Sequence, residues 1–105
     1  MREKLANYSL NIANLVGGPK AQGFALILGI TIDNIDYLED AIRAGVLERP
    51  ISQVRDNSPH GINCVVEVPV RGIGPKRRRV IDVRTIWELR VRGARPRLVS
   101  AFPRP

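Results

Sequence analysis

The chain has 105 residues, among them 17 Lys and Arg, 10 Asp and Glu and one Cys, and its net charge is +7. This length predicts one domain, residues 1–105, with a single modest core. No apolar run approaches the roughly 18 residues of a membrane-spanning helix, and no long apolar stretch follows the charged N-terminus, so we expect neither a membrane segment nor a signal peptide. The lone Cys64 excludes an internal disulfide and is compatible with a reducing cytoplasm.

The positive charge is concentrated in the second half of the chain. Residues 1–60 hold six Lys and Arg against seven Asp and Glu, whereas residues 61–105 hold eleven against three. A basic half of this kind is typical of proteins that bind a polyanion, and nucleic acid is the commonest one. The alternative is that the basic residues only keep the protein soluble. The charge asymmetry by itself does not exclude this.

Two helices are predicted within residues 17–48. In GGPKAQGFALILGI, Pro19 stands where a helix would begin, because its missing N–H would be unpaired there in any case, and Gly29 is a suitable terminator. The segment TIDNIDYLEDAIRAGVLE has apolar residues at helical spacing and Asp33 as a candidate N-cap. Both helices resemble scaffold, with Lys20 as the one side chain that invites a functional interpretation.

Residues 49–61 have a loop composition, and residues 62–103 predict a sheet. Pro69 cannot donate to a strand ladder, so its strand is an edge or is bulged there. We expect an α+β fold, with two N-terminal helices packed on one face of a three- to four-stranded antiparallel meander, and a short strand near residues 5–12 as the fourth. The three main strands are predicted at residues 62–71, 80–90 and 95–102.

The strand at residues 80–90 has an apolar face and a charged face. Its charged face carries Asp82, Arg84, Glu88 and Arg90. Two helices can cover only one side of the sheet, and nothing else in the sequence is available to cover the other. The charged side is therefore expected to be open, with a basic rim that suits an extended polyanion.

Few residues have side chains suited to catalysis or to metal binding. His60 is the only histidine and has an ordinary pKa near 6.5, which suits proton transfer at neutral pH, although a solvated loop side chain is the plainer interpretation. Lys20 lies in the first turn of a helix, where the helix dipole disfavours a cation, and this is a weak indication that it binds an anion. One His and one Cys with scattered carboxylates lack metal-ligand spacing, so we expect neither a metal nor another cofactor.

Three strand residues are further candidates. Arg84 can hold a phosphate in two hydrogen bonds, or it can form a cross-strand ion pair with Glu67. Thr85 and Ser100 each interrupt an apolar set, which either a satisfied buried hydroxyl or a functional role would explain. Other basic residues are candidate phosphate contacts, although such runs often only solvate a hairpin. These are Lys76, Arg77, Arg78, Arg79, Arg90 and Arg97.

These parts suit cleavage of RNA without a metal. That reaction needs a base for the 2′-hydroxyl proton, an acid for the leaving oxygen, and cations for the phosphate, which His60 with lysine and arginine can supply. DNA lacks the hydroxyl and would normally call for a metal ion.

Four segments resemble a known family. VGGPKAQGFALILGIT, HGINCVVEVPVRG, VIDVRTIWEL and RPRLVSAFP are similar to a family of small bacterial toxin-type domains, itself similar to the barnase–EndoU–colicin–RelE group of metal-independent ribonucleases. The likeness spans about residues 5–103 and implies Lys20, His60, Arg84, Thr85 and Ser100 as site residues. Where the family pattern has Thr and Tyr, this chain has Ser100 and Phe102, so position 102 is assigned no role.

The leading hypothesis is thus a small endoribonuclease toxin of a toxin–antitoxin or toxin–immunity pair, acting on RNA in the cytoplasm and neutralised by a cognate partner protein. Two alternatives stay open. One is a nucleic-acid-binding module without catalysis. The other is a protein-interaction domain whose edge strand pairs with a partner or with a second copy of the chain.

Overall fold

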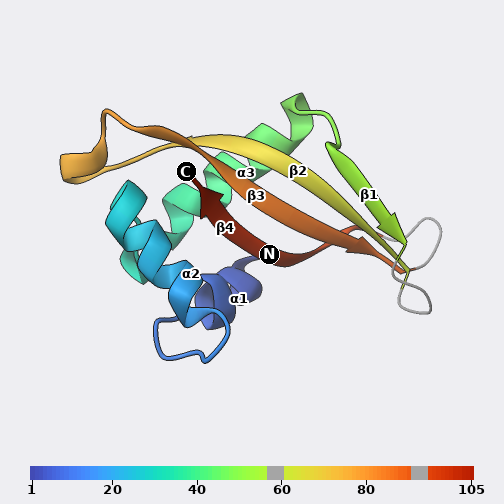
Figure 1. Cartoon of the computed structure of the whole chain (residues 1–105), viewed down its shortest axis with the longest axis horizontal. Coiled ribbons are helices and arrows are strands. Elements are labelled where there is room, and N and C mark those ends of the chain that lie inside the picture. Colours follow the sequence, from blue (N-terminus) through green and yellow to red (C-terminus); the bar gives the residue numbers. More distant parts are fainter. Residues whose placement is uncertain (57–60, 91–94) are drawn as a thin grey trace.

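The computed structural model describes residues 1–56, 61–90 and 95–105, and shows a compact α+β fold (Figure 1). Helical segments fill the N-terminal half, and a four-stranded antiparallel sheet of order β1-β2-β3-β4 follows, as predicted. No described helix is long and apolar enough to cross a membrane. The strands are Gln53–Asp56 (β1), Ile62–Arg71 (β2), Val80–Leu89 (β3) and Arg97–Arg104 (β4).

Three helices precede the sheet, and each has an irregular end. Gly29 ends the second helix with a φ of 69°, the left-handed conformation expected of a terminating glycine. The first helix is Arg2–Lys4 (α1), continued as a π-helical segment Leu5–Ser9 (η1); the second is Gly18–Gly23 (α2), continued as Phe24–Leu28 (η2); and a 3₁₀ turn, Ile32–Asn34 (η3), leads into Ile35–Glu48 (α3).

Three details of the sequence prediction are wrong. The strand expected near residues 5–12 is instead the end of the first helix, and the fourth strand is β1, inside the predicted loop 49–61. All four residues of β1 are exposed, so it lacks the apolar alternation that marks a half-buried strand. Asp33 is not the N-cap, because the Thr31 hydroxyl accepts a hydrogen bond from the Asp33 backbone N–H.

The core lies between the helices and one face of the sheet. In Figure 1, α3 passes behind the strands, and Gly45 lets it approach closely, because a Cβ there would lie 2.2 Å from a methyl carbon of Val68 on β2. The first helix and α2 pack along β4 at the sheet's edge. Apolar residues from all three helices meet those of β2, β3 and β4, among them Leu5, Phe24, Leu28, Leu38, Ile42, Val66, Val68, Val83 and Leu98.

Pro69 lies where the sequence requires it. β1 pairs with β2 only over residues 62–65, so beyond that point no described strand lies along this edge of β2 and none needs the missing N–H.

Candidate functional site

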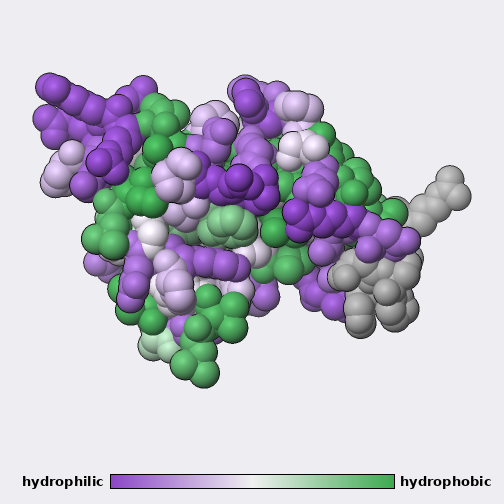
Figure 2. All heavy atoms as spheres, viewed as in Figure 1, coloured by the Kyte–Doolittle hydropathy of each residue, from purple (hydrophilic) through white to green (hydrophobic). Residues whose placement is uncertain are grey.

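The sheet face opposite α3 carries the polar alternation that the sequence predicted, but it is not open along its whole length as expected, because Val65, Glu88 and Ser100 on this face are buried. Arg84 on β3 lies between Glu67 on β2 and Phe102 on β4, and Ile86 in the next row lies beside Ser100. Figure 2 shows this side of the molecule as a mixed surface, with strongly hydrophilic groups over the strands and at the protruding turn before β3, and hydrophobic groups between them.

Lys20 of α2 reaches this face beside β4. Its Nζ donates hydrogen bonds to Ser100 Oγ at 2.7 Å and to the Tyr8 hydroxyl at 2.9 Å. The same nitrogen lies 4.6 Å from the ring centroid of Tyr8 and 5.2 Å from that of Phe102. We call these four residues the Lys20 cluster. It joins the first helix, the second helix and the last strand, and it brings together Lys20 and Ser100, two of the predicted site residues.

The Lys20 cluster is an array of hydrogen-bond donors. Within residues 1–56, 61–90 and 95–105, no carboxylate lies within 4.0 Å of Lys20, so this partly buried cation has neutral partners only. An ammonium has three N–H groups, of which the two hydroxyls accept two. Each hydroxyl accepts from Lys20 and so keeps its own proton for another acceptor. A partly buried cation without a counter-ion, surrounded by donors, is suited to an anion.

Arg84 adds a second cation to this face, one sheet row away from Ser100. Its Nε donates to Glu67 Oε1 at 2.6 Å, so the cross-strand ion pair, one of the two predicted alternatives, is confirmed. The pair uses one edge of the guanidinium, and the side chain stays 22% exposed. The other carboxylate oxygen of Glu67 is buried, without a hydrogen-bond partner among the described residues. Glu67 therefore fixes the direction of Arg84.

The predicted phosphate contacts form two groups rather than one patch. Lys76, Arg77, Arg78 and Arg79 lie in and after the 3₁₀ turn Gly74–Lys76 (η4), at the start of β3. At the other end of β3, Arg97 Nη2 lies 3.0 Å from Glu88 Oε1, and Arg90 donates to the same oxygen. The Arg90 hydrogen bond, with the charges of Arg90 and Arg97, holds the pKa of Glu88 below its usual range.

Thr85 is not part of the Lys20 cluster. It lies on the opposite face of β3 and is fully buried, its hydroxyl donating to the Val66 carbonyl at 2.7 Å and accepting from Trp87 Nε1 at 2.8 Å. These bonds account for its place in an apolar set, and an RNA strand cannot reach it. A catalytic role for Thr85 is therefore corrected to a structural one.

His60 lies outside the described residues. Val65 lies in the same row of the sheet as Ile86 and Ser100. Ile62, the first residue of β2, is three residues before Val65. That separation corresponds to about 10 Å along a strand.

Sequence reasoning missed two members of the site. Tyr8 was assigned to a strand, although its spacing of four from Lys4 fits the helix that the structure shows. Phe102 was assigned no role, and its ring centroid lies 5.2 Å from the Lys20 ammonium. Neither contact is visible in a sequence, because both depend on how the first two helices pack against β4. Among the described residues no group of three or more His, Cys, Asp or Glu could hold a metal ion.

Comparison with known proteins gives one match. A family model described as "Domain of unknown function (DUF6883)" matches residues 1–105. No curated protein and no solved structure matches the chain.

Proposed function

Since the chain belongs to the DUF6883 family along residues 1–105, and that family's description names no activity, we propose a function from the chemistry of the site: the protein is a metal-independent endoribonuclease. One observation carries this proposal. The Lys20 ammonium, 2.7 Å from Ser100 Oγ and 2.9 Å from the Tyr8 hydroxyl, has no carboxylate partner among the described residues and lies on the sheet face opposite α3, where Arg84 is paired with Phe102 of the same cluster.

The phosphodiester of RNA fits this array. In the proposed reaction the 2′-oxygen attacks the neighbouring phosphorus, its proton passes to a base, the P–O5′ bond breaks, and the O5′ oxygen receives a proton. The products are a 2′,3′-cyclic phosphate and a 5′-hydroxyl. Lys20 and Arg84 would neutralise the charge that grows on the phosphoryl oxygens, as preorganised donors do at other sites of charge development.

The hydroxyls have distinct proposed roles. The Tyr8 oxygen accepts from Lys20, so its own proton is free for the leaving O5′ oxygen. Ser100 positions Lys20 from the strand side. His60, which lies outside the described residues, is the base predicted from the sequence, and this role stays a prediction. The basic turn at residues 76–79 would contact phosphates farther along the strand.

The biological setting rests on the family resemblance alone. We propose a toxin that acts on cytoplasmic RNA and is held inactive by a cognate antitoxin or immunity protein. Growth arrest with RNA decay on expression in a bacterium, relieved by a Lys20→Met substitution, is the expected result. Unimpaired growth with full-length RNA would contradict it.

A non-catalytic nucleic-acid-binding module is the second candidate. It is favoured by one observation: the Lys20 cluster contains neither a carboxylate nor an imidazole, so none of its four residues is a ready base for the 2′-hydroxyl proton. This candidate predicts salt-sensitive binding of RNA and DNA alike, with no cleavage of either.

Cleavage of a fluorogenic oligoribonucleotide in EDTA separates the two. The wild-type chain should cleave it, and Lys20→Met and Arg84→Gln should each lower the rate about 100-fold or more, as expected for loss of one charge-stabilising donor. Arg43→Gln, a matched loss of charge on the exposed side of α3, should leave the rate unchanged. Full activity in both site variants would refute the assignment, and no cleavage by any variant would favour the binding module.

A further inference from the structure

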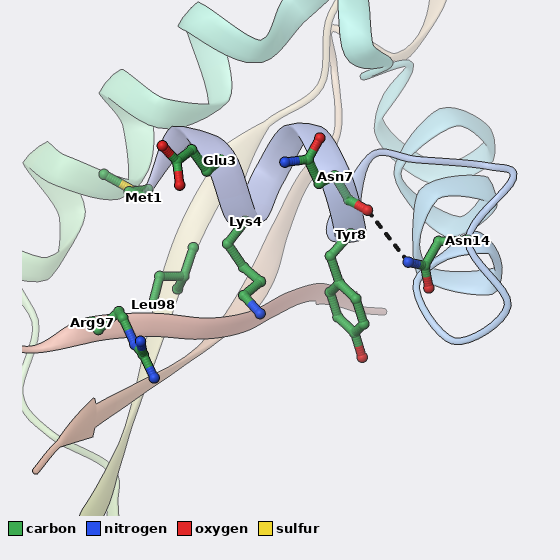
Figure 3. Close-up of a pocket in the computed structure, with 8 residues that line it drawn as sticks. All are labelled: Met1, Glu3, Lys4, Asn7, Tyr8, Asn14, Arg97 and Leu98. Carbon is green, nitrogen blue, oxygen red and sulfur yellow. Dashed lines mark hydrogen bonds between the residues drawn. The ribbon is translucent and has the colours of Figure 1, made fainter.

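A cleft adjoins the Lys20 cluster and shares Tyr8 with it. The cleft lies between the first helix and β4 and has a volume of about 480 Å³. Figure 3 shows its walls: Lys4 and Tyr8 point from one side of the helix toward β4, and Arg97 of β4 also lines the cleft, with its guanidinium extending past the edge of β4 that is away from the helix. This volume is typical of a pocket for one small ligand and is too small for a nucleic-acid duplex.

Two lysines flank the shared tyrosine. Lys4 Nζ lies 5.3 Å from the Tyr8 ring centroid, and Lys20 Nζ lies 4.6 Å from the same point. On the strand side, a β-bulge places Arg97 opposite Glu88, two residues along β3 from Ile86, the partner of Ser100, which is about 7 Å along the strand. Positive charge therefore continues from the Lys20 cluster through Lys4 to Arg97, over a length that spans neighbouring phosphates of one chain.

We propose that this cleft binds the phosphate next to the scissile one, so that the substrate is a single strand laid along β4 from Lys20 to Arg97. This inference rests on the proposed function for the identity of the scissile phosphate. Lys4 and Arg97 are the two residues that bind this phosphate, and Glu88, which accepts a hydrogen bond from Arg97 at 3.0 Å, positions that guanidinium.

The other polar groups of the cleft do not compete for the ligand. Glu3 lies on the upper side of the helix in Figure 3, away from Lys4 and Tyr8. The Asn14 side chain is used within the protein: its Nδ2 donates to the Asn7 carbonyl at 3.3 Å, and its Oδ1 accepts from the backbone N–H groups of Val16 and Gly17. Because the cleft carries the cations Lys4 and Arg97, we expect the subsite to contact mainly the phosphate backbone of the strand.

Binding of a 2′-O-methyl RNA hexamer, which the proposed reaction cannot cleave, tests the subsite by fluorescence anisotropy. Lys4→Gln with Arg97→Gln should weaken binding about tenfold for each cation removed at low salt. It should also reduce the slope of log affinity against log salt concentration by about 1.4, or about 0.7 for each positive charge that no longer binds the phosphate backbone. Oligo-U and oligo-A should show the same loss of affinity.

The matched control is Arg43→Gln with Arg49→Gln, which removes two exposed positive charges from α3 and its C-terminal end. Equal weakening in this control, an unchanged affinity in the cleft variant, or no binding by the wild-type chain would each overturn the subsite. If the double variant fails to fold, Lys4→Gln alone, at an exposed position, should still lower the slope by about 0.7. Binding that depends on the cleft without any RNA cleavage would refute the nuclease and keep the subsite, whereas cleavage without that dependence would refute the subsite alone.

Discussion

Replacing Lys20 with methionine separates a functional cation from a structural one. Methionine keeps the unbranched side chain and its packing beside Tyr8 and Phe102 but removes the charge and both hydrogen bonds. If the ammonium were structural, losing bonds of 2.7 and 2.9 Å from a charged donor would cost about 3–6 kcal/mol in the free energy of unfolding, taken at about 1.5–3 kcal/mol each.

The desolvation cost of the ammonium opposes this loss. A partly buried cation without a carboxylate partner carries a desolvation penalty of several kcal/mol, and this penalty disappears in the Lys20→Met variant. Two cation–π contacts, with ring centroids 4.6 and 5.2 Å from the ammonium, each favour lysine over methionine by about 0.5–1 kcal/mol. Because these contributions oppose each other, we expect the free energy of unfolding to fall by less than about 3 kcal/mol, while RNA cleavage falls about 100-fold or more.

Urea unfolding followed by Trp87 fluorescence gives the stability, and cleavage of a fluorogenic RNA per folded molecule gives the activity. Arg43→Gln is the control for loss of charge. A loss of more than about 3 kcal/mol with undiminished activity per folded molecule would show that Lys20 holds the fold together and would refute the reasoning.

Three further predictions concern the scaffold. Thr85→Val should lower the free energy of unfolding by about 2–4 kcal/mol, since it removes two buried hydrogen bonds, and should leave activity per folded molecule unchanged; lost activity in the folded variant would contradict its structural role. Gly45→Ala should be destabilising in thermal melts, because crowding against Val68, costing about 1–3 kcal/mol, exceeds a gain of about 1 kcal/mol in helix propensity; a higher melting temperature would mean that α3 packs farther from β2. The lowered pKa of Glu88 stabilises the fold above the ordinary glutamate pKa of about 4.3, and this contribution is lost as the pH falls through the lower folded value; a stability gap between wild type and Glu88→Gln that does not shrink as the pH falls below about 4.3 would contradict the ion pairing.

The sequence predicted the sheet face well because strand alternation is a local signal. Arg84 and Glu67 were placed on one face by counting alternate residues, and the structure confirms both the face and their ion pair. Lys20 was singled out because a cation is disfavoured in the first turn of a helix. The structure shows that its ammonium meets Ser100, which is 80 residues away in the chain.

What the sequence could not predict depends on packing between distant elements. Tyr8 joins the Lys20 cluster only because the first helix lies along β4, and no local pattern specifies that docking. The exposed strand β1 has too few apolar residues to be recognised, and its pairing with residues 62–65 defines it. Thr85 and Ser100 interrupt apolar runs in the same way, yet one hydroxyl is bonded within the core and the other meets a cation, a difference that only the three-dimensional packing reveals.

The most direct test of the central claim is an oligodeoxynucleotide that contains a single ribonucleotide, incubated with the protein in EDTA. If the donors around Lys20 act on a phosphodiester attacked by its own 2′-hydroxyl, cleavage occurs at the ribonucleotide alone and leaves a 2′,3′-cyclic phosphate and a 5′-hydroxyl, as mass spectrometry will show. Cleavage at deoxynucleotide positions, 3′-hydroxyl ends, or an intact strand would contradict the account.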